Sequence, residues 1–252
     1  MSRRRMLVAA ALAAVLGCAT ACSNATSSST PPGGAHSDQH ITVFAASSLT
    51  DAFTAAGKTY ESAHPGAKVT FSFAASSDLV QQVQQGAPAD VIATASTKTM
   101  DEVSKELSSP AKSFARNKLV IVTEPGNPKH ITTLADLAQS GVVVVLAAEG
   151  VPAGDYARQA LSDAHVTVHP KSLEPNVRGV LTEVELGEAD AGIVYVTDAL
   201  VAGGKVSSLP IPGAPIATYP IGAINDKGRA FVDFILSSEG QQILAKYGFL
   251  AP

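Results

Sequence analysis

The sequence has no tryptophan, and its only two cysteines, Cys18 and Cys22, lie close to the amino terminus. The chain that follows Cys22 can therefore form no disulfide and offers no thiol for catalysis or metal binding. Its stability has to come from an apolar core. A chain of 252 residues is long enough to bury one large core or two smaller ones.

Charged residues are also scarce: they make up 16% of the chain, and the formal net charge is -4. Three of the 18 basic residues form the arginine run at positions 3–5. Without that run, 15 basic residues remain against 22 acidic ones, a net charge of -7. An acidic body of this kind lacks the basic surface that nucleic-acid binding requires, so we expect no nucleic-acid partner.

Familiar catalytic motifs are missing as well. The sequence contains no Gly-x-Ser-x-Gly elbow, no phosphate-loop lysine motif and no Gly-x-Gly-x-x-Gly. Residues 109–112 (SPAK) match Ser-x-x-Lys, but neither Ser-Asp-Asn nor Lys-Thr-Gly follows. Two histidine pairs, His36 with His40 and His165 with His169, lack the cysteine or carboxylate pattern of a metal site. We expect no enzyme activity, no cofactor and no metal ion held by side chains.

Residues 1–21 have the pattern of an export signal. A basic start precedes the apolar run 6–17, which is too short for a typical membrane-spanning helix. Gly17-Cys18 and Ala21-Cys22 both resemble the small-residue-then-cysteine box of bacterial lipoproteins, in which the cysteine becomes the lipidated first residue of the mature protein. The sequence therefore indicates an exported protein with a lipid anchor on the outer face of the cell membrane.

Cys22 is the favoured anchor, because the polar segment 22–39 begins there and its Ser/Pro/Gly-rich start has the composition of a flexible tether. Cys18 stays a candidate, because Gly17 before it fits the lipoprotein box better than Ala21 before Cys22. An ordinary cleaved signal with incidental cysteines is the remaining alternative.

After this segment, a short strand passes directly into a helix. Residues 41–44 (ITVF) have the pattern of a buried strand, and from Leu49 the apolar residues recur at helical spacing. Ser47 and Ser48 lie at the switch, and Ser48 and Asp51 have the spacing of a capping box, with Asp in place of Glu or Gln. The free N–H groups and positive dipole end of a helix start favour an anion. Alternatively, Ser48 only caps its helix.

The same arrangement recurs downstream. A strand at 69–73 leads through Ser76 and Ser77 into a helix from Leu79, and residues 150–161 form a third switch of this kind. Residues 175–181 open a further helix with Asn176 as its cap. Ligands bind in the crevice beyond the carboxyl ends of parallel strands, so these switches predict a binding cleft. Strands that alternate with helices throughout predict an α/β fold with mostly parallel sheets.

Several motifs together carry a resemblance to a known family. They are residues 43–50 (VFAASSLT), 86–90 (GAPAD), 151–154 (VPAG), 192–195 (GIVY) and the tail 239–249 (EGQQILAKYGF). From about Ile41 to Phe249 the chain resembles the periplasmic molybdate-binding proteins, the solute-binding components of molybdate ABC importers. The resemblance implies the type II periplasmic-binding-protein fold, in which two lobes with helices on both sheet faces enclose a ligand cleft.

The resemblance also implies where the lobes begin and end. Lobe 1 comprises residues 40–117 and 221–252, and lobe 2 comprises residues 118–220. The chain crosses between them through strands at 118–123 and 219–224. The family binds a solute and passes it to the ABC transporter permease, which implies a monomer without enzyme activity.

Members of this family hold a tetrahedral dianion with two serines, two backbone N–H groups and a tyrosine hydroxyl. The matching positions are Ser48, Ser76, Ala153, Val177 and Tyr195. Ser47 and Ser77 compete with their neighbours, because each position has a second serine beside it. Arg178 is excluded and is expected to be a solvent-facing helix residue. Molybdenum would then be present only within the bound molybdate.

The expected solute is thus molybdate or tungstate, which have nearly the same size and charge. Two alternatives stay open. One is a binding protein for another solute, such as sulfate, phosphate or a small organic acid. The other is a secreted serine hydrolase that uses Ser48 or Ser109.

Replacing Cys22 tests the anchor. Cys22→Ser should release the protein from the membrane into the soluble fraction, because the lipid can no longer be attached, and fractionation followed by immunoblotting measures this. Cys18→Ser is the matched control and should leave the protein on the membrane. Release by Cys18→Ser alone would instead identify Cys18 as the lipidated residue.

Overall fold

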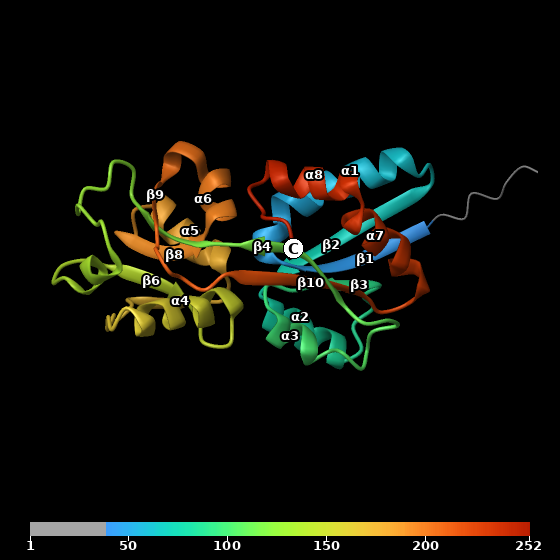
Figure 1. Cartoon of the computed structure of the whole chain (residues 1–252), viewed down its shortest axis with the longest axis horizontal. Helices are drawn as coiled ribbons and strands as arrows, with labels where there is room; N and C mark the ends of the chain where they lie inside the picture. Colours follow the sequence, from blue (N-terminus) through green and yellow to red (C-terminus); the bar gives the residue numbers. More distant parts are fainter. Residues whose placement is uncertain (1–38) are drawn as a thin grey trace, which may run out of the picture. The chain divides into compact units, whose positions relative to one another are not determined.

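The computed structural model describes residues 39–252, and two five-stranded sheets organise this part of the chain (Figure 1). The predicted export signal, both cysteines and the predicted tether lie outside the described residues, apart from Gln39, which begins the first strand. Within residues 39–252, no helix combines the length and the apolar character that crossing a membrane requires.

The first sheet has the strand order β2-β1-β3-β10-β4. β1 pairs in parallel with β2 and β3, whereas β10 runs antiparallel to β3 and β4. The carboxyl ends of the parallel strands therefore meet at one edge, where Ala46 pairs with Ala74. The strands are β1 (Gln39–Ala46), β2 (Ala67–Ala74), β3 (Val91–Ala93), β4 (Lys112–Asn117) and β10 (Ala217–Ala223).

The second sheet repeats this plan with the order β7-β6-β8-β5-β9. β6 pairs in parallel with β7 and β8, and β5 runs antiparallel to β8 and β9. The strands are β5 (Leu119–Thr123), β6 (Val144–Ala147), β7 (Ser172–Glu174), β8 (Ala191–Tyr195) and β9 (Ser207–Pro210). The predicted two-sheet α/β fold is confirmed.

The sheets are mixed, however, and the expectation of mostly parallel sheets is wrong. β5 and β10 each enter their sheet from the edge where the parallel strands end: Leu119 begins β5 opposite Tyr195, the last residue of β8. A strand that enters from this edge without a crossover helix has to run antiparallel to its neighbours. An apolar run in the sequence indicates a buried strand and carries no information about its direction.

The crossings between the sheets also differ from the expected strands at 118–123 and 219–224. β4 and β5 are separated only by Lys118, so the first crossing is one residue within a nearly continuous extended segment. The second crossing is the loop 211–216, and Ala217–Pro220 already pair with β4 in the first sheet. β4 was not predicted at all, because this half-exposed edge strand is rich in polar residues.

Helices cover both faces of each sheet (Figure 1). On the first sheet, α2 and α3 pack over a core around Phe44 and Ile92, and α1, α7 and α8 cover the opposite face. On the second sheet, α5 and α6 lie opposite α4. The helices are α1 (Thr50–Ala63), α2 (Ser76–Gln84), α3 (Thr97–Asp101), α4 (Pro152–Asp163), α5 (Val177–Glu185), α6 (Val196–Ala202), α7 (Asp226–Leu236) and α8 (Ser238–Lys246). Three short 3-10 helices are η1 (Ser47–Leu49), η2 (Leu134–Ala138) and η3 (Gly203–Lys205).

Aromatic packing holds α1 in place. The ring of Phe53 is fully buried, and its centre lies 5.6 Å from that of Phe114 on β4 and 6.1 Å from that of Phe231 on α7. Aromatic pairs at these separations contribute about 0.5–1.5 kcal/mol beyond the burial of their area. Because α1 directly follows η1, this packing also fixes the segment that carries Ser47 and Ser48.

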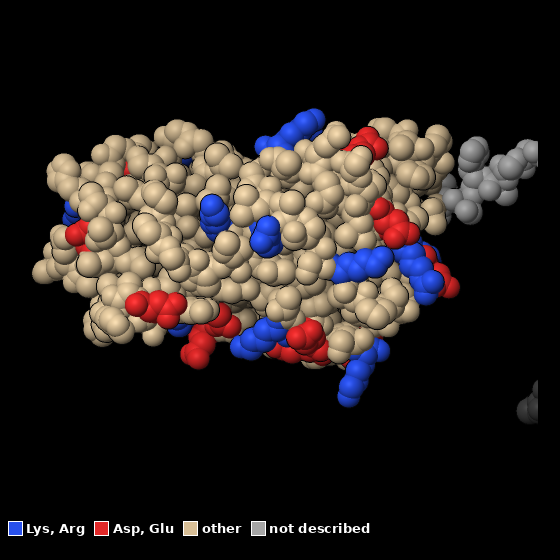
Figure 2. Space-filling view, in the orientation of Figure 1, with Lys and Arg blue, Asp and Glu red and all other residues tan. Residues whose placement is uncertain are grey.

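The surface shown in Figure 2 carries acidic and basic side chains interspersed along its lower and right-hand edges, with a few more scattered over the rest of the face. Basic side chains do not gather into one field on this face. That distribution agrees with the low charged fraction of the sequence.

Candidate anion-binding site

All five predicted ligand residues line one small cavity. Its wall is formed by residues that follow β1, β2 and β3 in the first sheet and by the starts of α4 and α5 and the end of β8 in the second. The cavity measures about 10 Å³, which is about the space that one water molecule needs. No charged side chain lines it. The predicted ligands on its wall are Ser48, Ser76, Ala153, Val177 and Tyr195.

Helix starts converge on this cavity from both sheets. η1 leads into α1, α2 begins at Ser76, α4 begins at Pro152 and α5 begins at Val177. The first N–H groups of a helix have no partner within the helix, and the helix dipole places partial positive charge there. Ala153 is the second residue of α4 and Val177 the first of α5, so both backbone N–H groups are of this free kind.

Ser48 does not form the predicted capping box. It lies inside η1, and neither η1 nor α1 has a hydrogen bond to a capping side chain. Ser48 is 3% exposed, and its hydroxyl shares a hydrogen bond of 2.9 Å with the hydroxyl of Tyr219 on β10. The added 3-10 turn displaces Ser48 from the capping position, and Asp51 pairs elsewhere. Ser47 also lines the cavity, so both serines stay candidates.

Ser76 lies at the cavity, whereas its neighbour Ser77 is not among the lining residues. Ser76 is buried, and its Oγ atom accepts a hydrogen bond of 3.0 Å from the backbone N–H of Ala95. A hydroxyl that accepts from a backbone N–H keeps its own proton for another partner. The geometry therefore favours Ser76 over Ser77 as the residue that contacts a bound molecule.

Tyr195 ends β8 with its side chain 1% exposed. Its hydroxyl has no hydrogen-bond partner among the described residues. Burial raises the pKa of Tyr195 well above 10, so the hydroxyl keeps its proton. An unpartnered buried donor costs about 1–3 kcal/mol, which an acceptor in the cavity would recover.

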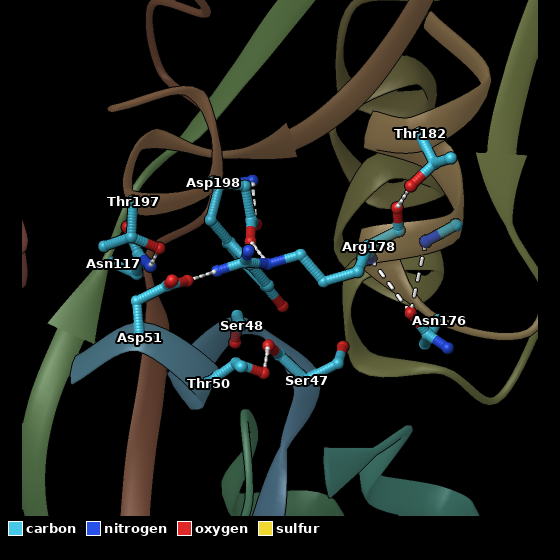
Figure 3. Close-up of polar contacts among 12 residues, drawn as sticks. Ser47, Ser48, Thr50, Asp51, Asn117, Asn176, Arg178, Thr182, Thr197 and Asp198 are labelled. Carbon is cyan, nitrogen blue, oxygen red and sulfur yellow. Dashed lines mark hydrogen bonds and ion pairs between the residues drawn. The ribbon is translucent and has the colours of Figure 1, made fainter. Parts of the chain in front are cut away.

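Arg178 was expected to face solvent, and this expectation is wrong. Its guanidinium lies between two carboxylates, 2.6 Å from Asp51 and 2.7 Å from Asp198 (Figure 3). Asp51 belongs to α1 of the first sheet, and Asp198 to α6 of the second. Helical spacing indicates which face a residue occupies, but it cannot reveal a partner 127 positions away in the sequence.

Asp198 is fully buried, and its second oxygen accepts a hydrogen bond of 3.2 Å from the backbone N–H of Tyr195. Burial raises the pKa of Asp198 to about 6, and the positive charge of Arg178 opposes this rise. Arg178 does not line the cavity. It links α1, α5 and α6. Of these helices, α1 follows the 3-10 turn that contains Ser48, α5 begins at Val177, and α6 follows Tyr195.

Comparisons with known proteins place the chain in a family. A family model described as bacterial extracellular solute-binding protein matches residues 41–250. The molybdate-binding protein ModA of Mycobacterium tuberculosis is 40% identical over 233 residues, which cover 89% of each chain.

Two solved structures share the fold at lower identity. The sulfate-binding protein SubI from Mycobacterium tuberculosis has a TM-score of 0.74 at 21% identity over 83% of this chain and 86% of its own. The periplasmic molybdate-binding protein of Azotobacter vinelandii has a TM-score of 0.71 at 17% identity over 84% of this chain and 99% of its own. One of these two proteins is named for sulfate and the other for molybdate, so the same fold serves different anions.

Removing Arg178 tests its role in charge compensation. Arg178→Met leaves Asp198 buried without a counter-charge and should lower the free energy of unfolding by about 3–5 kcal/mol, measured by urea denaturation of unliganded protein. The loss should be smaller at about pH 5 than at about pH 8, because protonation of Asp198 removes the uncompensated charge.

Lys98→Met is the matched control. Lys98 forms an ion pair of 3.5 Å with Asp155 across the two halves, but its side chain is 75% exposed. Such a pair contributes about 0–1 kcal/mol. Equal effects of the two substitutions would contradict a special role for Arg178.

Proposed function

This chain belongs to the bacterial extracellular solute-binding proteins, and we propose that its solute is molybdate or the closely similar tungstate. The protein captures the oxyanion outside the cytoplasm and delivers it to the permease of an ABC importer. The observation that carries this proposal is the cavity itself, because five donors from both halves of the fold line one uncharged space.

The binding chemistry uses neutral donors only. The hydroxyls of Ser48, Ser76 and Tyr195 and the N–H groups of Ala153 and Val177 each offer one proton to an anion oxygen. A hydrogen bond to a charged group contributes about 1.5–3 kcal/mol, and each helix start adds about 0.3–1 kcal/mol. A handful of such donors offsets the dehydration of a dianion without a paired lysine or arginine.

Binding is coupled to approach of the two halves. The donors at Ser48 and Ser76 lie in the half built around the first sheet. Those at Ala153, Val177 and Tyr195 lie in the half built around the second. An anion that contacts both sets has a higher affinity for the form in which they are close, and it shifts the population toward that form. The halves that move are residues 39–117 with 217–252, built around the first sheet, and residues 119–210, built around the second.

The mature protein is a monomer held at the outer face of the cell membrane by a lipid on Cys22, with Cys18 as the alternative. The anchor is supported by the sequence, namely a cysteine box after an apolar run and before a polar tether. The monomer is supported by the resemblance to the solute-binding family.

Two other functions receive less support. Sulfate or phosphate would use the same donors, and the anion panel below separates them from molybdate. A serine hydrolase needs a base beside its nucleophile. In residues 39–252, Ser48 pairs with Tyr219 and no hydrogen bond joins Ser48 or Ser109 to a histidine.

Serine substitutions test the ligand set. Ser48→Ala and Ser76→Ala should each weaken molybdate binding roughly 10- to 150-fold, because each removes one hydrogen bond to a charged group. Calorimetric titration of stripped protein measures this. The melting temperature without ligand should fall modestly as well, because Ser48→Ala leaves the Tyr219 hydroxyl and Ser76→Ala leaves the Ala95 N–H without a partner. Ser77→Ala is the matched control and should bind normally. Ser47→Ala decides between the two neighbouring serines, because it should weaken binding only if Ser47 contacts the anion. Lower melting with normal affinity in both alanine variants would show that the two serines are only structural.

An anion panel tests selectivity. A donor-only cavity leaves the proton of monohydrogen phosphate without an acceptor, at a cost of about 1–3 kcal/mol. Sulfate has no such proton but is smaller, so the donors of the two closing halves cannot all reach it without straining the closure. The expected order is molybdate near tungstate, then sulfate, then phosphate, measured by competition titration. Tyr195→Phe should weaken molybdate binding while keeping the ring. Sulfate or phosphate binding as tightly as molybdate would contradict the assignment.

A further inference from the structure

The hydrogen bond between Tyr219 and Ser48 connects a predicted ligand to a residue outside the cavity wall. The two hydroxyl oxygens are 2.9 Å apart, and the residues are separated by 171 positions in the sequence. Tyr219 is fully buried in β10, and it is not among the residues that line the cavity. Its ring packs edge-on against Tyr195 at 5.9 Å and against Phe249 at 5.4 Å.

The direction of this bond decides what Ser48 can do. A serine hydroxyl has one proton and two lone pairs, so it donates to one partner only. If Ser48 donates to Tyr219, no proton remains for an anion whose oxygens are all acceptors. If Tyr219 donates to Ser48, the serine proton is free for the cavity. Burial holds the pKa of Tyr219 above its usual value of 10, so the phenol has a proton to give.

Ser76 shows the same arrangement with an unambiguous direction. Its Oγ atom accepts from the backbone N–H of Ala95, which can only donate. Of the serines that line the cavity, Ser48 and Ser76 thus each have a lone pair next to a donor of the protein. The hydroxyl of Tyr219 is thus the counterpart, at Ser48, of the Ala95 N–H that donates to Ser76.

We propose that Tyr219 is a positioning residue that donates to Ser48, turns the serine proton toward the bound anion and thereby selects fully deprotonated oxyanions. The inference rests on the proposed function and adds a specificity determinant to that site. Without the Tyr219 hydroxyl, Ser48 is free to rotate and to accept a proton from the ligand. Monohydrogen phosphate then finds an acceptor, whereas molybdate loses a held donor.

The test is Tyr219→Phe, which keeps the ring packed against its aromatic neighbours. Stripped protein is titrated calorimetrically with molybdate, sulfate and phosphate at about pH 8. Affinities for molybdate and sulfate should fall by similar factors, about tenfold or more, while phosphate affinity stays the same or rises. A merely structural role would weaken all three anions by one common factor, and that result would overturn the proposal.

A double substitution shows whether Tyr219 acts through Ser48. Adding Tyr219→Phe to Ser48→Ala should cause no further loss of molybdate affinity, because the group being positioned is already absent. An independent loss of the same size in that background would also overturn the proposal. Tyr60→Phe is the matched control: its hydroxyl is buried and unpartnered among the described residues, and Tyr60 is not among the residues that line the cavity.

Failure of this inference can be told apart from failure of the proposed function. If wild-type protein binds molybdate and the ratio of molybdate to phosphate affinity is unchanged in Tyr219→Phe, only the role of Tyr219 is wrong. If wild-type protein binds none of the three anions, the proposed function is wrong and the inference falls with it.

Discussion

Buried hydrogen-bond donors without protein acceptors are the constraint on which the rest of this structure depends. The starts of α2, α4 and α5 and the hydroxyl of Tyr195 point their donors into a space that no charged side chain enters. Leaving such donors unpaired is costly, and an anion is the partner that satisfies several of them at once. The mixed sheets serve this arrangement, because both place the ends of their parallel strands at the same cavity.

The charged side chains near the cavity pair with one another and do not line it. Arg178 lies between Asp51 and Asp198 and connects elements of both halves (Figure 3). A buried carboxylate such as Asp198 needs this counter-charge, because an uncompensated charge in a dry interior is strongly destabilising. With the charges paired among themselves, selection among anions falls to neutral groups whose proton positions are fixed. Tyr219 matters for the same reason, since it determines the direction in which Ser48 can donate.

Much of the fold was predictable, because local spacing reports local structure. The switches at Ser48, at Ser76 and at Pro152 were found from strand and helix periodicity, and Asn176 caps α5 as expected. The short polar edge strand β4 was missed, because its half-exposed residues do not form an apolar run.

The sequence by itself determined which chemical groups are present: serines at strand-to-helix switches, a body without thiols, and a chain pattern of an α/β fold. Only the tertiary structure decided the partners of those groups. It turned Asp51 from a predicted cap into a partner of Arg178, and it placed Tyr219 against Ser48. The physical reason is that periodicity encodes which face of an element is buried, whereas a hydrogen bond across 171 positions depends on how the sheets pack.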